Sequence, residues 1–359
     1  MPPARQLPAH DSDTGANRMF SSAMLKLDAA AETARIVESM RVHVLRTLRK
    51  QGAVVGLSGG IDSSVVAALC AEAFGRDRVV ALFMPEHHSS RDSLMLGRSV
   101  ADAIGIQAVI ENIAPVLEAT GCYDRQDDAI KRVVPEYGPG WKFKLVLPSI
   151  LEGERLSLTR LTVQRPGGES TTVRLTREAY LQLVAATNFK QRVRKMTEYY
   201  HADRLNYAVA GTPNRLEYDQ GFFVKQGDGA ADFKPIAHLY KTQVYQLAEH
   251  LGIPEQVRKR PPTTDTFSMP QTQEEFYFAL PYDRMDLCLY AYNHNVCAAE
   301  VAPAVGLTTA QVERVFKDIA AKRRATRHLH FPPLLVDPVP EICFFPLPLS
   351  SEDPGQKKH

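Results

Sequence analysis

Residues 53–64 constrain the fold of this chain more than any other stretch. The apolar run at residues 53–57 predicts a buried strand, and the apolar residues 65–74, closed by Gly75, predict the helix that follows. Two consecutive glycines in the intervening turn let backbone N–H groups approach a ligand, and the helix N-terminus adds its positive dipole end. This strand, turn and helix predict a site for an anion, with phosphate as the best candidate.

The side chains of the turn indicate a nucleotide bound together with a metal ion. Serine hydroxyls can donate to phosphate oxygens, and a carboxylate beside phosphate favours a bridging divalent cation such as Mg²⁺. The Walker pattern of kinases and GTPases is absent from the sequence. A Gly-Gly pair before a helix is often only a tight turn, and this alternative stays open for the motif alone. The candidate phosphate-binding residues are Ser58, Gly59, Gly60, Asp62, Ser63 and Ser64.

Length and composition predict a soluble, cytoplasmic α/β protein. The 359 residues, of which 44% are hydrophobic, suffice for one large core. The net charge of +2 does not indicate a nucleic-acid partner. Five cysteines without a C-x-x-C pair indicate neither a zinc site nor a disulfide framework. No apolar run approaches the ~20 residues needed to cross a bilayer, so we expect no membrane contact.

Strands and helices alternate on both sides of the phosphate turn. An amphipathic helix over residues 28–50 precedes it, and strand 79–84, helix 93–104 and strand 108–110 follow. Such alternation predicts a doubly wound parallel sheet, whose ligands lie beyond the carboxyl ends of the strands. We therefore expect the loop at residues 85–90 to face the same nucleotide as the phosphate turn.

The alternation breaks over residues 124–178, which indicates an insertion. Near-alternating apolar residues and a Pro-Gly-Gly turn predict a β-hairpin over residues 156–175. A dimer contact, a lid over the site and a neutral decoration are all open as roles for it. The core resumes with a helix over residues 178–200 and a strand over residues 207–210.

The two ends of the chain differ in composition from the domain that we expect over residues 23–330. Residues 1–22 lack apolar periodicity and predict a flexible tail. Residues 331–359 are rich in proline and predict an extended arm that could lie over a partner subunit.

A second candidate motif follows the strand at residues 207–210. Thr212 and Pro213 suit the start of a helix, and Glu217 lies in its first turn. A carboxylate at this sheet edge could be the second ligand of the metal that Asp62 contacts, although a surface glutamate is the simpler alternative. Lys241, at the start of another helix over residues 241–251, could reach phosphate, although solvated lysines are commoner.

Several motifs in order and spacing resemble the NAD synthetase family. The phosphate turn alone resembles the wider N-type ATP pyrophosphatases, which have an adenine nucleotide alpha hydrolase-like fold. The resemblance covers residues 28–324 apart from the hairpin, and its motifs are residues 188–194, Gly-Thr-Pro-Asn-Arg-Leu-Glu at 211–217, Gly-Phe-Phe-Val-Lys-Gln-Gly-Asp-Gly-Ala-Ala-Asp at 221–232, Leu-Tyr-Lys at 239–241 and Pro-Thr-Thr-Asp at 262–265. It implies that ATP adenylates the carboxylate of deamido-NAD and that ammonia then displaces AMP to give NAD.

The resemblance also implies a role for each matching residue. Asp62 and Glu217 correspond to magnesium ligands, and Asp62, Lys241 and Asp228 to the catalytic groups. Thr212, Lys241 and Thr263 correspond to residues that contact ATP together with the phosphate turn. The positions expected beside deamido-NAD are Arg192, Lys225, Asp228 and Asp232.

Other expectations concern partners and alternatives. The family resemblance implies a homodimer. Residues 1–57 contain no cysteine that could attack glutamine, so ammonia is the expected nitrogen donor, and a separate glutaminase stays open. Near the C-terminus Lys322-Arg323-Arg324 is present but proline arrives only at residue 332, which departs from the family pattern. An enzyme that amidates another carboxylate is the alternative; a binding protein without catalysis is disfavoured because both acids are present.

Overall fold

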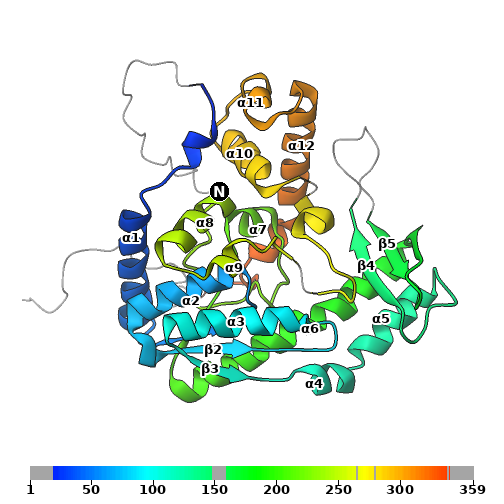
Figure 1. Ribbon diagram of the computed structural model, residues 1–359, viewed down its shortest axis with the longest axis horizontal. Coiled ribbons are helices and arrows are strands. Elements are labelled where there is room, and N and C mark those ends of the chain that lie inside the picture. The colour runs from blue at the N-terminus through cyan, green and yellow to red at the C-terminus, as the bar shows by residue number, and fades with distance from the viewer. Residues whose placement is uncertain (1–18, 148–158, 264–265, 279, 338, 340–359) are drawn as a thin grey trace, which may run out of the picture.

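The computed structural model describes residues 19–147, 159–263, 266–278, 280–337 and 339. Its central sheet has four parallel strands in the order β3-β2-β1-β7 (Figure 1). The strands are β1 (Ala53–Gly56), β2 (Val79–Phe83), β3 (Gln107–Ile110) and β7 (Ala208–Ala210). Val54 pairs with Val80 on one side and with Val209 on the other. The predicted parallel α/β sheet is confirmed.

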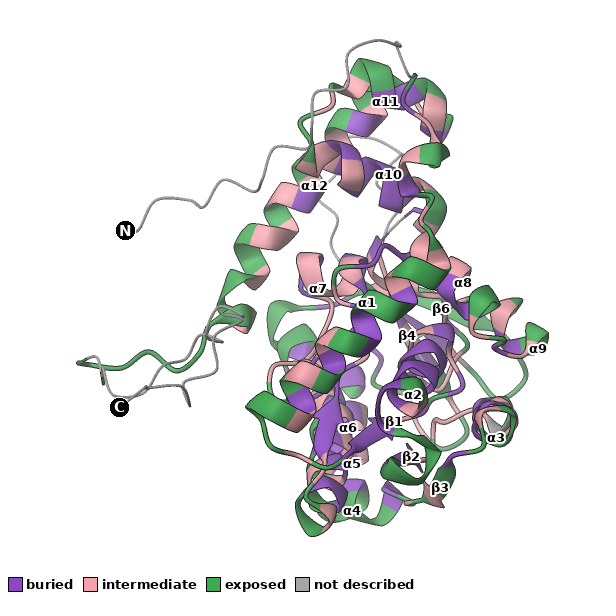
Figure 2. Cartoon of the chain, turned by 90° about the vertical axis from the view of Figure 1, so that its left-hand side faces the viewer, coloured by how far each residue is buried: buried purple, intermediate pink, exposed green. Residues whose placement is uncertain are grey.

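Successive side chains of each strand point to opposite faces of the sheet, because side chains in a strand alternate with a period of two residues. Val55, Ala81 and their equivalents pack against α1 (Ala29–Arg41), α2 (Ile61–Phe74), α3 (Arg91–Ile104) and α8 (Lys241–His250). Val54, Val80 and Val209 face α6 (Arg177–Leu205). Because helices cover both faces, β1, β2 and β7 are apolar throughout, whereas the edge strand β3 is mostly exposed. Buried residues gather around β1, α2 and α6 in Figure 2.

Most predicted elements occur with shifted ends. The helix expected over residues 28–50 is α1 followed by a π-helical turn, Val42–Thr47, and Asp28 caps α1 by accepting from the backbone of Ala31 at 3.0 Å. The helix after the phosphate turn begins at Ile61, earlier than its apolar run. Smaller elements are Ser22–Leu25, Arg76–Arg78, α4 (Ala114–Ala119), α5 (Cys122–Lys131), α9 (Glu255–Arg258) and Arg327–His330.

A second apolar cluster lies above the sheet in Figure 1. It is built by α7 (Arg215–Gln220), the π-turn Glu274–Phe278, α10 (Tyr282–Asn293), α11 (Ala298–Val305) and α12 (Thr309–Thr326). Phe20 belongs to this cluster and is 7% exposed. The packed part of the chain therefore begins before residue 23, within the predicted tail, whose residues 1–18 lie outside the described residues.

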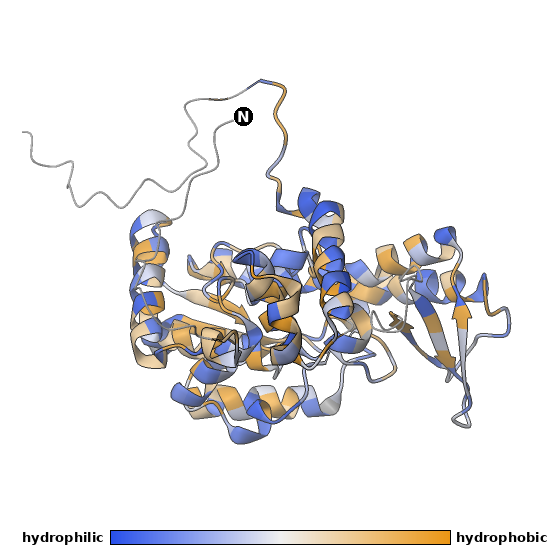
Figure 3. Cartoon of the chain, turned by 90° about the horizontal axis from the view of Figure 1, so that it is seen from above, coloured by the Kyte–Doolittle hydropathy of each residue, from blue (hydrophilic) through white to orange (hydrophobic). Residues whose placement is uncertain are grey.

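The insertion forms a separate antiparallel sheet of three strands, at the right of Figure 3. Its strands are β4 (Lys142–Val146), β5 (Arg160–Gln164) and β6 (Ser170–Arg174). The predicted hairpin is confirmed as β5 and β6, joined by a turn in which Gly168 has φ +93°. β4 was not predicted. Residues 156–158, at the start of the predicted hairpin, lie outside the described residues. Phe143, Leu145 and Leu161 pack this sheet against α5 and α6.

None of the helices in the described parts of the chain combines the length and the apolar character that a membrane crossing requires.

Candidate active site

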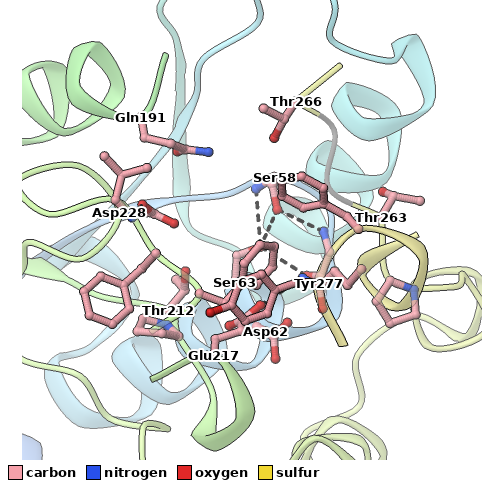
Figure 4. A pocket seen from close by; sticks show the side chains of 18 of the residues that line it. Ser58, Asp62, Ser63, Gln191, Thr212, Glu217, Asp228, Thr263, Thr266 and Tyr277 are labelled. Atoms are coloured by element: carbon pink, nitrogen blue, oxygen red, sulfur yellow. Dashed lines mark hydrogen bonds between the residues drawn. The ribbon is translucent and has the colours of Figure 1, made fainter. Parts of the chain in front are cut away.

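One cavity of about 810 Å³ opens at the carboxyl ends of β1, β2 and β7. Figure 4 shows Asp62, Ser63, Thr212 and Glu217 grouped on its floor, with Asp228 on one side and Thr263 on the other. Segments far apart in the sequence meet here because parallel strands all end at this edge. The predicted residues that line the cavity are Ser58, Gly60, Asp62, Ser63, Thr212, Glu217, Asp228, Lys241 and Thr263.

Hydroxyl groups and glycines fix the phosphate turn. The Ser58 hydroxyl accepts from the N–H of Gly60 at 3.3 Å, and the Ser63 hydroxyl donates to the Gly60 carbonyl at 3.1 Å. Gly59 has φ +76°, and a Cβ there would lie 2.5 Å from the carbonyl oxygen of Ser93. Any larger residue at this position would both strain the backbone and collide with α3. The turn is thus held open toward the cavity by its own side chains.

A capping box places two carboxylates on the same wall of the cavity. The side chain of Asn214 caps α7 by accepting from the backbone N–H groups of Leu216 and Glu217. In return, the Glu217 carboxylate accepts from the backbone N–H of Asn214 at 3.1 Å. The side-chain amide of Asn214 also donates to the carboxylate of Asp62 at 3.1 Å. Asn214 therefore orients both acids, one at the start of α2 and one at the start of α7.

Lys241 supplies the positive charge of this wall. Its ammonium, 2% exposed, donates to Asp62 Oδ2. Burial lowers the pKa of Lys241, but the charges of Asp62 and Glu217 outweigh it and raise that pKa above its usual value. Asp286 fixes the start of α8 by accepting from the N–H groups of Lys241 and Thr242 at 3.2 and 2.7 Å. A protonated lysine thus stands beside the phosphate turn.

The two acids are suited to a divalent cation. Burial, followed by repulsion from Asp62, raises the pKa of Glu217 to about 8. A cation between the two carboxylates would relieve both effects. The described residues include no group of three His, Cys, Asp or Glu side chains placed to hold a metal. Mg²⁺ commonly takes one or two carboxylates together with phosphate oxygens and waters, so Asp62 and Glu217 fit a metal that arrives with a nucleotide.

Not every predicted site residue lines the cavity of the described structure. Ser64 is buried and its hydroxyl donates to the Gly60 carbonyl at 2.8 Å, which closes the first turn of α2. Arg192 is exposed on α6. Lys225 donates to the carbonyls of His328 and Phe331 at 3.1 and 3.2 Å, and Asp232 accepts from the N–H of Val209 at 2.7 Å. The roles of Arg192, Lys225 and Asp232 toward deamido-NAD stay predictions.

One polar face of α6 also lines the cavity, and none of its residues was predicted as a site residue, although part of the face lies in the motif at residues 188–194. The residues of this face are Gln191, Arg194, Lys195 and Glu198. Lys195 and Glu198 form an ion pair of 2.6 Å with side chains 7% and 8% exposed. Gly56 leaves room for it, because a Cβ there would lie 2.7 Å from Glu198 Oε1. The spacing of three, four and seven residues on a long helix was the available signal.

Asp228 faces the cavity beside these residues. Its carboxylate accepts from the N–H of Val224 at 2.7 Å. Burial raises the pKa of Asp228, and the positive charges of Lys195 and Arg194 reduce this effect. Asp228 is consequently a stronger base than an exposed aspartate.

The insertion contributes to the apolar part of the cavity. Leu145 and Leu147 lie on its wall, together with Val184 of α6 and the aromatic rings of Phe267 and Phe276. A flat ring could pack there while its phosphates lie at the opposite, polar part. The insertion therefore contacts the candidate site, whatever its role.

Comparison with known proteins decides the family. The sequence model of NAD synthase matches residues 32–134 and 162–328. The chain is 67% identical over 312 residues to the NH(3)-dependent NAD(+) synthetase of Mesorhizobium japonicum, which covers 87% of this chain and 98% of that protein. The chain belongs to the NAD synthase family. It is also 35% identical over 280 residues to the NH(3)-dependent NAD(+) synthetase of Thermotoga maritima, covering 78% and 91% of the two chains.

Solved structures agree on the fold. The NH3-dependent NAD synthetase of Campylobacter jejuni has a TM-score of 0.56 at 22% identity, over 87% of this chain and 100% of that one. The NMN synthetase of Francisella tularensis has a TM-score of 0.59 at 20% identity, over 86% and 99%. The predicted family and fold are confirmed. The NAD synthase match leaves residues 135–161 between its two ranges, and β4 lies in this unmatched part.

Proposed function

We propose that this protein is a ligase that amidates deamido-NAD with ammonia, using ATP and releasing AMP and pyrophosphate. The observation that carries the proposal is the grouping of the phosphate turn, Asp62, Glu217 and Lys241 on one cavity of a NAD synthase-family chain. This set of groups suits departure of pyrophosphate better than transfer to a protein nucleophile.

In the first step the nicotinate carboxylate attacks the α-phosphorus of ATP. The bond from that phosphorus to the α–β bridging oxygen breaks, and pyrophosphate leaves with the electron pair. Ser58 and the N–H groups at the start of α2 donate to its oxygens, and Lys241 balances its charge. Mg²⁺ held by Asp62 and Glu217 would supply further charge neutralisation on the phosphates.

In the second step ammonia attacks the acyl carbon of the adenylate. The C–O bond to AMP breaks, AMP leaves with the electron pair, and the nitrogen loses a proton. Asp228 accepts this proton, because its buried carboxylate is basic and faces the cavity. Holding both reactants in one cavity is the main contribution of the protein to this step.

The proposal extends to assembly and location. A homodimer is supported by an exposed apolar row on α6, where Leu181, Met196 and Tyr200 are 53%, 58% and 63% exposed. Arg192 lies on the same exposed side, so a partner could bring substrate contacts to it. Cytoplasmic location is supported by Cys70, Cys122, Cys288 and Cys297, which are free thiols.

The test is an assay with ATP, Mg²⁺, ammonium and deamido-NAD that follows NAD, AMP and pyrophosphate together. Equal amounts of all three products are expected. Release of ADP and phosphate would refute the proposal, and faster amidation of nicotinic acid mononucleotide would favour the alternative acceptor. Ammonia-free glutamine should give no NAD; use of glutamine only after a second protein is added would identify a separate glutaminase.

A further inference from the structure

A loop from the main domain runs along the free edge of the inserted sheet. One edge of β4 pairs with β5. At its other edge the Ser268 hydroxyl accepts from the N–H of Phe143 at 2.8 Å and donates to the Phe143 carbonyl at 3.5 Å, and the N–H of Met269 donates to the same carbonyl at 3.1 Å. The side-chain amide of Gln271 donates to the Leu145 carbonyl. Residues 266–273 thus provide partners for three backbone groups at the free edge of β4, which are the N–H and carbonyl of Phe143 and the carbonyl of Leu145.

Buried side chains fix the same contact. Phe267 is 4% exposed, with its ring centroid 5.6 Å from that of Phe143 and 5.3 Å from that of Phe276. Gln271 is also 4% exposed, so its side-chain N–H group depends on the Leu145 carbonyl as its acceptor. Breaking this bond would leave a buried polar group without a partner, which is costly.

Both ends of the loop reach the site. At its start the Thr266 carbonyl accepts from Lys190 at 2.8 Å, and Lys190 is fully buried in an ion pair with Glu86 of 3.1 Å. At its end the side chain of Gln273 donates to Glu217 Oε1 at 2.8 Å. The loop therefore connects the inserted sheet to Glu217, one of the two carboxylates suited to the metal.

We infer that β4 is a positioning element for the ATP side of the site, which holds residues 266–273 so that Gln273 orients Glu217. This inference rests on the proposed function for its kinetic consequence. β4 lies in the range that the NAD synthase match leaves out, so the device is additional to what the family match covers. It assigns the insertion a role in the site that a neutral decoration would not have.

The test compares Gln271→Met with the matched control Gln164→Met. The Gln164 side chain also donates to a backbone carbonyl within the insertion, that of Gly168 at 3.2 Å, but on the exposed side away from the cavity. Gln271→Met keeps the side-chain volume and removes the donor. Ser268→Ala, which removes a partly exposed hydroxyl, serves as a second variant that retains the core.

Two readouts are measured. Amide hydrogen exchange of Met269, whose N–H donates to β4, should quicken by about tenfold in Gln271→Met and Ser268→Ala, since a lost hydrogen bond of about 1.4 kcal/mol corresponds to a factor of ten. The KM for magnesium-ATP should rise by a similar factor while the KM for deamido-NAD changes less than twofold. Gln164→Met should leave both readouts at their wild-type values.

Unchanged exchange at Met269, or the same change in Gln164→Met, would overturn the inference. A rise in exchange with both KM values unchanged would also overturn it, because the contact would then be structural only. If the wild-type protein made no NAD, the proposed function would fail while the exchange experiment still decided whether β4 holds the loop.

Discussion

The side-chain amide of Asn214 donates a hydrogen bond of 3.1 Å to the carboxylate of Asp62, which lies 152 positions earlier in the chain. The same residue caps α7 and anchors Glu217. A single helix cap therefore determines how two acids from different strand–helix units face one cavity. The first prediction separates its two tasks.

We predict that Asn214→Asp keeps the cap of α7 but lowers kcat/KM by at least about tenfold. Aspartate caps helices as well as asparagine does, whereas it would repel Asp62 instead of donating to it. Asn214→Ala should lose both functions, with a stability cost of about 1 kcal/mol for the cap. Thermal unfolding and steady-state kinetics check this. Full activity of Asn214→Asp would show that orientation of Asp62 by the amide is unimportant.

A second prediction concerns the charge of Lys241. Lys241→Met should lower kcat by roughly 10² to 10³, the usual loss when one group that stabilises developing charge is removed. Lys259, an exposed lysine paired with Glu255 at 2.6 Å, gives the control Lys259→Met, which should be unaffected. Initial rates at saturating ATP distinguish the two. Wild-type turnover in Lys241→Met would remove Lys241 from the reaction.

A third prediction concerns pH and His88, in the loop after β2. Burial, followed by the charge of Lys190, lowers the pKa of His88 to about 4, against 6.5 for the ordinary group. The unfolded chain therefore binds a proton at His88 between these two values and the folded chain does not. Its contribution to stability is complete above pH 6.5 and is lost as pH falls toward 4.

His88→Gln keeps an acceptor for Lys190, which donates to His88 Nδ1 at 2.7 Å, and removes the titration. The free energy of unfolding should consequently fall less steeply in this variant between pH 6.5 and pH 4.5, by on the order of 2 kcal/mol. Denaturant unfolding at both pH values provides the measurement. Parallel slopes for the two proteins would exclude His88 as the titrating group.

The sequence predicted the elements that local chemistry specifies. The phosphate turn and the start of α7 are each encoded within a few residues, by glycines and serines in one case and by Asn214 and Glu217 in the other. Their meeting followed from the topology of parallel sheets. For that reason the floor of the cavity was predictable without coordinates.

Long-range contacts were not predictable in the same way. No local sequence pattern pairs residues 266–273 with β4. The residues 148–158 between β4 and β5 lie outside the described part of the chain. Lys225 lies in a loop that resembles a ligand-binding segment, and its ammonium donates to two backbone carbonyls beyond the end of α12. Such partners are chosen by packing between distant segments, on which single-sequence patterns carry little information.

A fourth prediction tests the proposed dimer. Met196→Glu, in the exposed apolar row of α6, should weaken self-association because it would bury an unpaired charge. Met95, 63% exposed on α3, provides the control Met95→Glu, which should leave association unchanged. Sedimentation velocity over a range of concentrations measures the effect. A wild-type protein that is fully active as a monomer would contradict the assembly.

The last prediction concerns the metal. Glu217→Gln and Asp62→Asn should each lower kcat/KM by orders of magnitude at limiting Mg²⁺, because each removes one of two carboxylates suited to the cation. Both folds should survive, since each acid lies at the start of a helix and borders the cavity. Circular dichroism establishes the fold, and titration of initial rates with Mg²⁺ at saturating ATP measures the dependence. Glu274, in the π-turn and outside the cavity lining, gives the control Glu274→Gln, whose Mg²⁺ dependence should match that of the wild-type protein. Wild-type turnover of Glu217→Gln at limiting Mg²⁺ would refute the assignment of Glu217, whereas a loss that excess Mg²⁺ partly restores is the result expected for a weakened ligand.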